Sequence, residues 1–488
     1  MARFAQPSNL DQAYQLMRSG NALAALPFAE NAVAGQDVCL PAHGMLATIL
    51  LQLGRPVDAE TVVAQALECR QGSADAYDAL AHVSMLLGMH ERSNALYRRV
   101  VDLAPNDPRF WYNLASSERS FGRLLEAESA CDKAIALDAT QHASYLLRSE
   151  LRVQSESANH IEELKAQLAC PTLSDRSRVL LGYALAKELD DLQQFDQAFR
   201  WFAEAAKSRR HQIKYDVALD ERKLQRIKEV FPQQPSHTSY ADRESSRYIF
   251  IIGLPRSGTT LLEHILTGLS GVRSNGETEN FTRALLTAAP ADRGDVFSCA
   301  AAADPNAVAA NYSRFANAAS TEQMIVEKLP MNYLYLGAIH NALPQARLLL
   351  VRRAPLDSCF AMYRTLFGEA YPFSYDFDDL ARYYAAYDRL ITHWHDSFGD
   401  SVREIEYEQL VKSPAQVGAG VAEHCGLNWN PRAVEVHKSA SVSFTASAAQ
   451  IRRPIYGSSS GRWRHYRKHL EPLVRALRSC QVVLPEDA

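Results

Sequence analysis

The chain has 488 residues, 47% of them hydrophobic, which suggests two to four domains with sizeable cores. With 52 Lys and Arg against 56 Asp and Glu residues, its formal net charge of −4 excludes a general attraction to nucleic acid or anionic membranes. The eight cysteines lack metal-ligand spacing, and the N-terminal residues lack the apolar core of a signal peptide. We therefore expect a cytoplasmic protein with no membrane span, nucleic-acid partner or metal, in which any anion site is local.

A repeat of 34 residues runs through the first part of the chain. Glycine recurs at this interval at Gly20, Gly54, Gly88 and Gly122, and small or apolar residues recur in step with it. This period, with glycine between two helices, resembles the tetratricopeptide repeat (TPR). The segment from Arg178 to Arg210 leaves the register but still indicates a helix pair, which we expect to dock on the later part of the chain. We predict an N-terminal all-α TPR solenoid over residues 8–217.

The repeats suggest a role only by analogy with other solenoids. Their concave faces bind peptides or proteins, so an acceptor protein held there is one expectation. A spacer or a homodimerisation module explains the pattern equally well. A stretch rich in Pro, Ser and charge, Phe231 to Arg247, comes after the repeats. We place a linker over 218–246 and a second domain over 247–480.

The second domain opens with a strand, a tight loop and a helix. Tyr248–Ile252 is aromatic or β-branched, as is typical of a strand buried in a parallel sheet, and apolar residues recur at helical spacing after Thr260. A loop that leads into a helix N-terminus directs N–H groups and the helix dipole at one point, where phosphate binds. Gly253, Gly258 and Thr260 fit the P-loop pattern GxxxxGK[ST], but Thr259 replaces its lysine. The loop therefore suits a 5′-phosphate with one further group; a plain strand-to-helix turn is the alternative.

Short apolar runs alternate with helical ones in the rest of this domain. The alternation predicts an α/β fold with a central parallel sheet and ligands at the carboxyl ends of its strands. Arg352 and Arg353 come directly after the run Leu348–Val351, and Lys328 comes after Met324–Val326, so these cations are expected at the edge that carries the loop. Paired arginines there suit a second phosphate, because guanidinium groups bind phosphate at two points. A solvated surface pair is the alternative.

Three motifs carry a family resemblance: PRSGTT after one strand, RRAPLD after another, and TASAAQIRRPIYGSSSGRW near the C-terminus. Together they resemble sulfotransferases that use 3′-phosphoadenosine 5′-phosphosulfate (PAPS), most closely the TPR-fused bacterial branch related to tyrosylprotein sulfotransferases. The resemblance covers about residues 247–480. It implies an α/β P-loop-like domain that transfers a sulfuryl group from PAPS to a hydroxyl without a metal. Protein tyrosine, a glycan and a small phenol or alcohol are all open as acceptors.

The resemblance also implies donor-binding residues. The loop would hold the 5′-phosphosulfate, and Arg353 the 3′-phosphate. The full set implied is Arg256, Ser257, Gly258, Thr259, Thr260, Arg353, Tyr407, Ser447 and Arg462. The family usually has a serine eight residues after the arginine, where this chain has Ala361. Either one contact is lost or the register shifts to Arg352, with Arg364 beyond it.

The same resemblance implies the catalytic residues. Glu277, in SNGETENF, matches a Gly-Glu motif of the tyrosylprotein branch and is our predicted general base, with Glu279 as competitor. Lys328, assisted by Ser447, would stabilise charge on the leaving phosphate. Two other classes remain: a P-loop NTPase, disfavoured by the missing lysine, and a TPR scaffold with a weakly active nucleotide-binding domain, which Ala361 favours.

Overall fold

The computed structural model describes residues 8–35, 39–67, 72–232, 245–289, 295–316, 324–438, 449, 452–455, 457 and 459–485. The chain divides into two compact units, Met1–Leu151 and Arg152–Ala488. Among the helices in the described ranges, none is long and apolar enough to cross a membrane.

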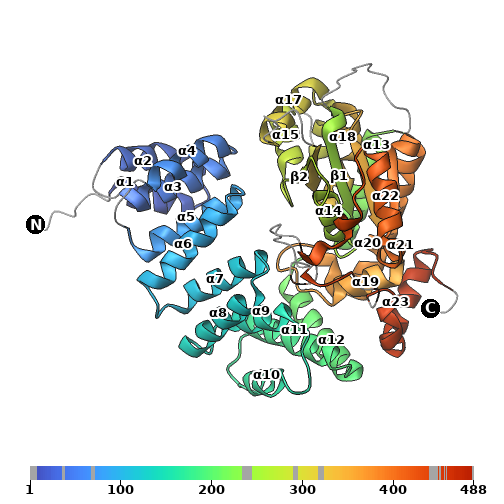
Figure 1. The fold of residues 1–488 in the computed structure, drawn as a ribbon, viewed down its shortest axis with the longest axis horizontal. Coiled ribbons are helices and arrows are strands. Elements are labelled where there is room, and N and C mark those ends of the chain that lie inside the picture. The colour runs from blue at the N-terminus through green and yellow to red at the C-terminus, as the bar shows by residue number, and fades with distance from the viewer. Residues whose placement is uncertain are drawn as a thin grey trace, which may run out of the picture. The chain divides into compact units, whose positions relative to one another are not determined.

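The first unit is an array of helix pairs (Figure 1). The pairs are α1 (Asn9–Arg18) with α2 (Ala22–Ala34), α3 (Cys39–Gln52) with α4 (Pro56–Ala66), α5 (Ala74–Leu86) with α6 (His90–Leu103), and α7 (Pro108–Ser120) with α8 (Leu124–Leu137); α9 (His142–Leu151) comes next. Gly20, Gly54, Gly88 and Gly122 lie at the four turns, with φ between +73° and +77°. Glycine alone adopts this left-handed backbone without steric cost, so the 34-residue period is a period of turns. The predicted repeat fold is confirmed.

A second helical segment begins the second unit. It consists of α10 (Ile161–Leu168), α11 (Asp175–Asp191), α12 (Phe195–Gln212) and α13 (Val217–Val230). The α11–α12 pair packs on later parts of the unit: the Tyr183 hydroxyl donates to the Tyr363 carbonyl (3.2 Å), and the rings of Phe199 and His469 stack at 4.5 Å. The expected docking of this last helix pair on the later part of the chain is thus observed.

Part of the segment expected as a linker, 218–246, is helical. It begins with α13, which packs against α20 (Phe377–Phe398). Leu224 and Ile227, spaced for one helix face, are buried, and the ring of Phe231 at the helix end packs against Trp394 of α20, 6.2 Å between ring centres. Residues 233–244 lie outside the described residues.

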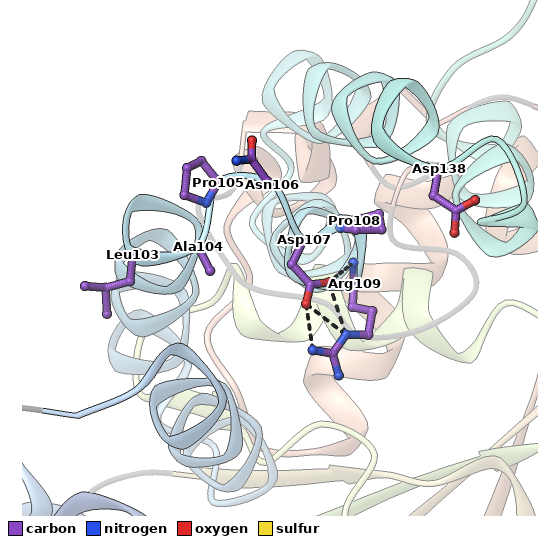
Figure 2. A pocket seen from close by; sticks show the side chains of 8 residues that line it. All are labelled: Leu103, Ala104, Pro105, Asn106, Asp107, Pro108, Arg109 and Asp138. Atoms are coloured by element: carbon purple, nitrogen blue, oxygen red, sulfur yellow. Dashed lines mark hydrogen bonds and ion pairs between the residues drawn. The ribbon is translucent and has the colours of Figure 1, made fainter.

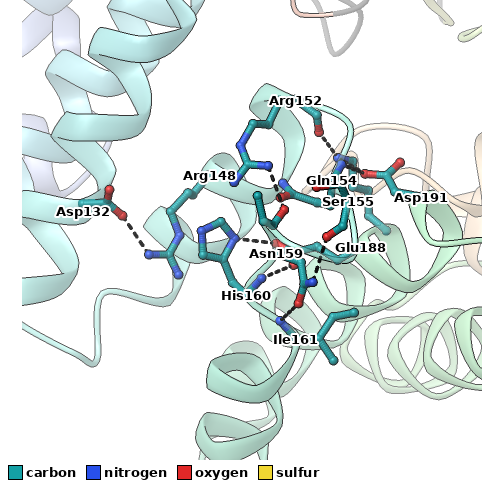
Figure 3. A network of polar contacts seen from close by, with 12 residues as sticks. Asp132, Arg148, Arg152, Gln154, Ser155, Asn159, His160, Ile161, Glu188 and Asp191 are labelled. Carbon is teal, nitrogen blue, oxygen red and sulfur yellow. Dashed lines mark hydrogen bonds and ion pairs between the residues drawn. The ribbon is translucent and has the colours of Figure 1, made fainter.

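A polar network ties the first residues of the second unit to α11 (Figure 3). The fully buried Glu188 carboxylate accepts a hydrogen bond from the His160 backbone N–H (2.6 Å) and contacts His160 Nδ1 (2.9 Å). The Asp191 carboxylate accepts from the Gln154 N–H (2.8 Å). Helix α11 therefore organises the segment before it as well as the residues after it.

The second unit is built on a five-stranded parallel sheet in the order β2-β3-β1-β4-β5. Its strands are β1 (Tyr248–Gly253), β2 (Val272–Ser274), β3 (Met324–Lys328), β4 (Arg347–Arg352) and β5 (Val402–Glu406). The helices are α14 (Thr259–Thr267), α15 (Asn280–Ala288), α16 (Val296–Ala302), α17 (Pro305–Phe315), α18 (Leu336–Ala342), α19 (Pro355–Tyr363), α20, α21 (Tyr407–Lys412), α22 (Pro414–His424) and α23 (Arg467–Ser479). The predicted α/β fold with a central parallel sheet is confirmed.

Alternation along β1 assigns its side chains to two helical layers. Ile249 and Ile251 pack in a core with α14, α21 and α22, whereas Phe250 contacts Phe281 of α15 and Tyr312 of α17. The chain leaves β1 toward β2 and β3, then crosses β1 to reach β4 and β5. The carboxyl ends of β1 and β4 therefore form a topological switch point, where open α/β sheets bind ligands.

Candidate functional site

The loop after β1 is a cradle of left-handed backbone. Arg256 has φ +67° and Gly258 has φ +103°, and the Ser257 N–H donates to the Leu254 carbonyl (3.2 Å). A Cβ at Gly258 would come within 2.4 Å of the Tyr407 ring, so only glycine fits there. Thr259 and Thr260 form the buried first turn of α14, at the positive end of the helix dipole.

The Ser257 hydroxyl has an unmet hydrogen-bonding capacity. Its oxygen is buried and makes no regular hydrogen bond among the described residues. A buried polar atom without a partner is costly, and at a helix N-terminus an anion would supply one. The cradle and this hydroxyl fit a bound phosphate.

The two arginines after β4 have different partners. Arg353 Nη1 donates to the Arg256 carbonyl (3.1 Å), its Nη2 donates to the Ser459 carbonyl, and its guanidinium lies 4.8 Å from the Tyr407 ring centre. Arg352 instead pairs with Asp388 at 2.5 Å and approaches Glu404 at 3.6 Å. The geometry places Arg353, rather than Arg352, against the loop.

Residues from the C-terminal segment complete this side of the loop. The Tyr407 and Ser459 hydroxyls are 2.5 Å apart, and the Gly461 N–H donates to Asp357 Oδ2 (2.6 Å). Neither Ser459 nor Asp357 was singled out by sequence, although both lie inside the quoted motifs GSSSGRW and RRAPLD. Ala361 and Ser358 are both buried on α19, and Ser358 lines a small hollow behind the loop together with Ser257.

A lysine with two carboxylates lies at the end of β3. The side chain of Lys328 is fully buried, and its Nζ is 2.5 Å from Glu277 Oε1 and 3.5 Å from Glu263 Oε2. Glu277 is 37% exposed and so stays open to an incoming group. Glu263, on α14, also accepts from the Ser274 hydroxyl (2.6 Å) and was missed by the sequence analysis. Its only signal was its position on the helix after the loop.

The competing bases are placed differently. Glu279 is the N-cap residue of α15 and makes no capping hydrogen bond with its side chain. His264 is buried on α14 with Nδ1 2.9 Å from the Thr260 carbonyl, and burial lowers the pKa of its ring. His264 is thus a packed histidine and not a candidate base.

The comparisons with known proteins agree with this geometry. The profile described as "Sulfotransferase family" matches residues 248–431, which hold the loop, Glu277, Lys328 and Arg353. Tetratricopeptide repeat profiles match residues 16–83, 74–107 and 108–141. The chain carries a sulfotransferase-family domain behind TPR repeats.

Individual relatives are more distant. An uncharacterized protein of Aquifex aeolicus is 29% identical over 374 residues, which is 73% of this chain and 48% of that protein. The match thus spans about half the length of the curated relative. The sulfotransferase domain of a Synechococcus olefin synthase is 16% identical, with a TM-score of 0.35, over 49% of this chain and 95% of that one. The sulfotransferase domain from the curacin biosynthetic pathway is 18% identical, with a TM-score of 0.35, over 49% and 98%.

One predicted donor ligand of the sulfotransferase domain is held by α11. Arg462 Nη2 and Arg364 Nη1 each lie 2.6 Å from Asp190 Oδ2, and the Tyr466 hydroxyl donates to the other oxygen. Burial alone would raise the pKa of Asp190, but the two guanidinium charges hold it below its usual value. The contact of Arg462 with a donor stays a prediction. Ser447 lies outside the described residues.

A hollow of about 660 Å³ lies at the α6–α7 corner of the repeats (Figure 2). It is lined by the segment from Leu103 to Arg109, with Asp138 nearby. Arg109 is paired with Asp107 inside it (Nη2 to Oδ2, 2.6 Å). Because that charge is already satisfied, the hollow does not resemble the anion cradle of the sulfotransferase domain.

Proposed function

We propose that the sulfotransferase domain transfers a sulfuryl group from PAPS to an acceptor hydroxyl. The single observation that carries the proposal is the buried Lys328 ammonium, held 2.5 Å from the partly exposed Glu277 carboxylate at the sheet edge that bears the loop. A nucleotide-binding scaffold does not need a half-open carboxylate beside a buried ammonium. A sulfuryl transferase needs both groups.

The donor would lie across the switch point. The cradle from Arg256 to Thr260 would hold the 5′-phosphosulfate, and Arg353 would hold the 3′-phosphate beside the Tyr407 ring. Arg353 is only 7% exposed, and its ion pair with Asp357 is a long one, with 3.8 Å between Nη2 and Oδ1. Its charge is therefore available to a phosphate.

The reaction balances with the residues present. The acceptor oxygen forms a bond to sulfur while the bond from sulfur to the bridging phosphate oxygen breaks, which releases adenosine 3′,5′-bisphosphate. The acceptor proton passes to Glu277, which acts as the base. Lys328 faces the oxygen on which negative charge grows and stabilises it. The Lys328 ion pair keeps the Glu277 carboxylate in place until the acceptor arrives.

For the acceptor we propose a tyrosine hydroxyl of a protein or peptide. The support is the Gly276-Glu277 pair, which resembles the tyrosylprotein branch, and the presence of repeats of a type that binds peptides. Glycan hydroxyls and small phenols need the same base, so they are the alternatives that an experiment must separate.

The test is transfer of labelled sulfur. Purified protein is incubated with ³⁵S-labelled PAPS and a panel of tyrosine peptides, glycans and phenols, and products are identified by mass. We expect a sulfuryl adduct on tyrosine peptides that disappears in Glu277→Gln and persists in the neighbouring control Glu279→Gln. An adduct confined to glycans or phenols overturns the acceptor proposal, and no adduct with any acceptor overturns the proposed reaction.

A further inference from the structure

The loop that carries Glu277 is anchored to β3 at both ends. Before Glu277, the Lys328 N–H donates to the Gly276 carbonyl (3.2 Å). After it, the Phe281 N–H in the first turn of α15 donates to Glu327 Oε1 (3.3 Å). The first anchor is a backbone hydrogen bond, but the second is a side-chain carboxylate that can change its charge.

Glu327 is an unusual residue for a central strand. It is fully buried, and alternation along β3 directs it to the sheet face opposite Lys328. Its second oxygen, the Tyr312 hydroxyl and the Asn332 side-chain amide make no hydrogen bonds of regular geometry among the described residues, although Tyr312 and Asn332 lie close enough to Glu327 to act on its carboxyl. A buried carboxylate with one formed hydrogen bond costs stability, and an apolar side chain would suit the fold better. No step of the proposed reaction uses it directly.

The surroundings of Glu327 leave its charge finely balanced. Burial raises the pKa of its carboxyl to about 7, although the Phe281 N–H and the side chains of Tyr312, Asn332 and Asn280 lower it in part. Tyr312 is the titratable group that faces Glu327 from α17, and burial together with the Glu327 charge raises the pKa of its phenol well above the usual value, so it stays neutral.

Other charged groups lie one step further from Glu327. Arg273 on β2 and Tyr248 on β1 act on Tyr312, with Arg273 lowering and Tyr248 raising the pKa of its phenol. Lys328 projects from the opposite face of β3. Because burial raises the pKa of Glu327 to about 7, we expect both of its charge states near neutral pH.

We propose that Glu327 is a positioning residue for Glu277: its ionised carboxylate holds the first turn of α15 and thereby fixes the loop from Gly276 to Asn280. An ionised acceptor makes a stronger hydrogen bond than a neutral one, and a negative charge at a helix N-terminus is stabilised by the helix dipole. Protonation weakens both effects and loosens the loop. The inference rests on the proposed function, in which Glu277 is the base.

Rate and stability then respond to pH in opposite directions. A carboxyl whose folded pKa is raised is favoured in its neutral form by the fold, so stability falls as pH rises from the unfolded value of 4.5 to about 7. The rate rises over the upper part of the same interval, because the ionised form holds the loop. A residue with a purely structural role would change rate and stability together.

The test combines hydrogen exchange with kinetics between pH 5.5 and 8.5. In the wild-type protein, amides at the start of α15, corrected for their intrinsic exchange rates, should become several-fold less protected below pH 7. Glu327→Gln should remove this dependence. It should also lower kcat about five-fold to ten-fold at pH 8, with the Kd for adenosine 3′,5′-bisphosphate within about two-fold, since a charge-assisted hydrogen bond becomes a neutral one. The limb of the rate profile near pH 7 should vanish.

Glu188→Gln is the matched control, because Glu188 is also fully buried and accepts a backbone N–H at the start of a helix. It should lose stability but keep the limb near pH 7. The inference is overturned if hydrogen-exchange protection at the start of α15 does not depend on pH. It is also overturned if Glu327→Gln keeps the full rate and an unchanged limb near pH 7. If no acceptor is sulfated, the proposed function fails, and the pH dependence of hydrogen exchange in the wild-type protein decides the role of Glu327. The same wild-type measurement decides the question if Glu327→Gln does not fold.

Discussion

Two helix pairs with the same turn have different roles in this molecule. In the α5–α6 pair, the Gly88 N–H donates to Met85 and the next N–H donates to Ser84; in the α11–α12 pair, the Gln193 N–H donates to Asp190 and the next to Leu189. Gly88 has φ +75° and Gln193 has φ +59°, so the backbone turns are closely similar.

The side chains before the two turns separate the pairs. At five, three and two residues before the turn residue, α5 has Val83, Met85 and Leu86, whereas α11 has Glu188, Asp190 and Asp191. The first set serves a repeat array, and the second holds a preceding loop and two arginines of the sulfotransferase domain. The same backbone turn thus forms both helix pairs, and the side chains before the turn differ according to the unit in which the pair packs.

The largest expected effect belongs to the second unit alone. Glu277→Ala should lower kcat about 10²–10⁴-fold with little change in donor affinity, because a general base acts on the acceptor proton. Single-turnover rates and isothermal titration with adenosine 3′,5′-bisphosphate measure the two quantities. Lys328→Ala should change both. Retention of more than about a tenth of the rate in Glu277→Ala would place the base elsewhere.

The next largest effect is expected when the Asp190 carboxylate, which joins α11 to the sulfotransferase domain, is removed. Asp190→Ala should lower the free energy of unfolding by about 3 kcal/mol, because it leaves Arg364 and Arg462 without their shared partner. Denaturant unfolding measures this. In the repeats, Asp58→Ala breaks an exposed pair with Arg55 and should cost under about 1 kcal/mol.

The Asp190 carboxylate should also make the stability of the second unit depend on pH. Because the folded pKa of Asp190 is depressed, its stabilisation is present above the unfolded value of 3.8 and is lost as pH falls through the folded pKa. Asp190→Asn should flatten the acid side of the stability profile. An equal loss of stability from Asp58→Ala and Asp190→Ala would contradict the distinction between the two pairs.

Arg352 and Arg353, which follow β4, should also differ in whether their loss affects stability or donor binding. Arg353→Ala should weaken donor binding about ten-fold or more, the cost of one charged hydrogen-bonding group. Arg352→Ala should affect stability more than affinity, since its partners are Asp388 and Glu404. Titration calorimetry without divalent metal checks both. Equal affinity losses would favour the shifted register, and binding seen only for ATP with magnesium would favour a kinase.

The smallest effect concerns the turns themselves. Gln193→Gly should stabilise the second unit by about 0.5–1 kcal/mol, since an L-residue in left-handed backbone costs more than the added freedom of glycine. Gly88→Gln should destabilise the repeats by a similar amount, because its Cβ would meet open space and only the backbone resists. Thermal unfolding of both variants measures these two changes in stability. A loss of stability in Gln193→Gly would mean that the glutamine side chain has contacts of its own.

Local periodicity determined much of the architecture. The 34-residue glycine interval predicted the turns, since left-handed backbone selects glycine at each one, and the alternation of apolar runs predicted the parallel sheet. The loop from Gly253 to Thr260 and the cations after β3 and β4 were found because parallel strands bring their carboxyl ends to one edge. These features depend on residues close together in the chain.

Tertiary structure decided what depends on distant residues. Three contacts join segments that are far apart in the sequence. Lys328 pairs with Glu263, Arg353 donates to the Ser459 carbonyl beside the loop, and Arg462 pairs with Asp190. No short sequence pattern relates these residues. The sequence analysis placed α13 in a linker because the composition after it is typical of one, whereas in the structure its apolar residues are buried and the helix packs against α20 and α16. The charge of Glu327 is likewise a property of burial, since the strand sequence MIVEK alone does not show that its glutamate lacks water and faces α15.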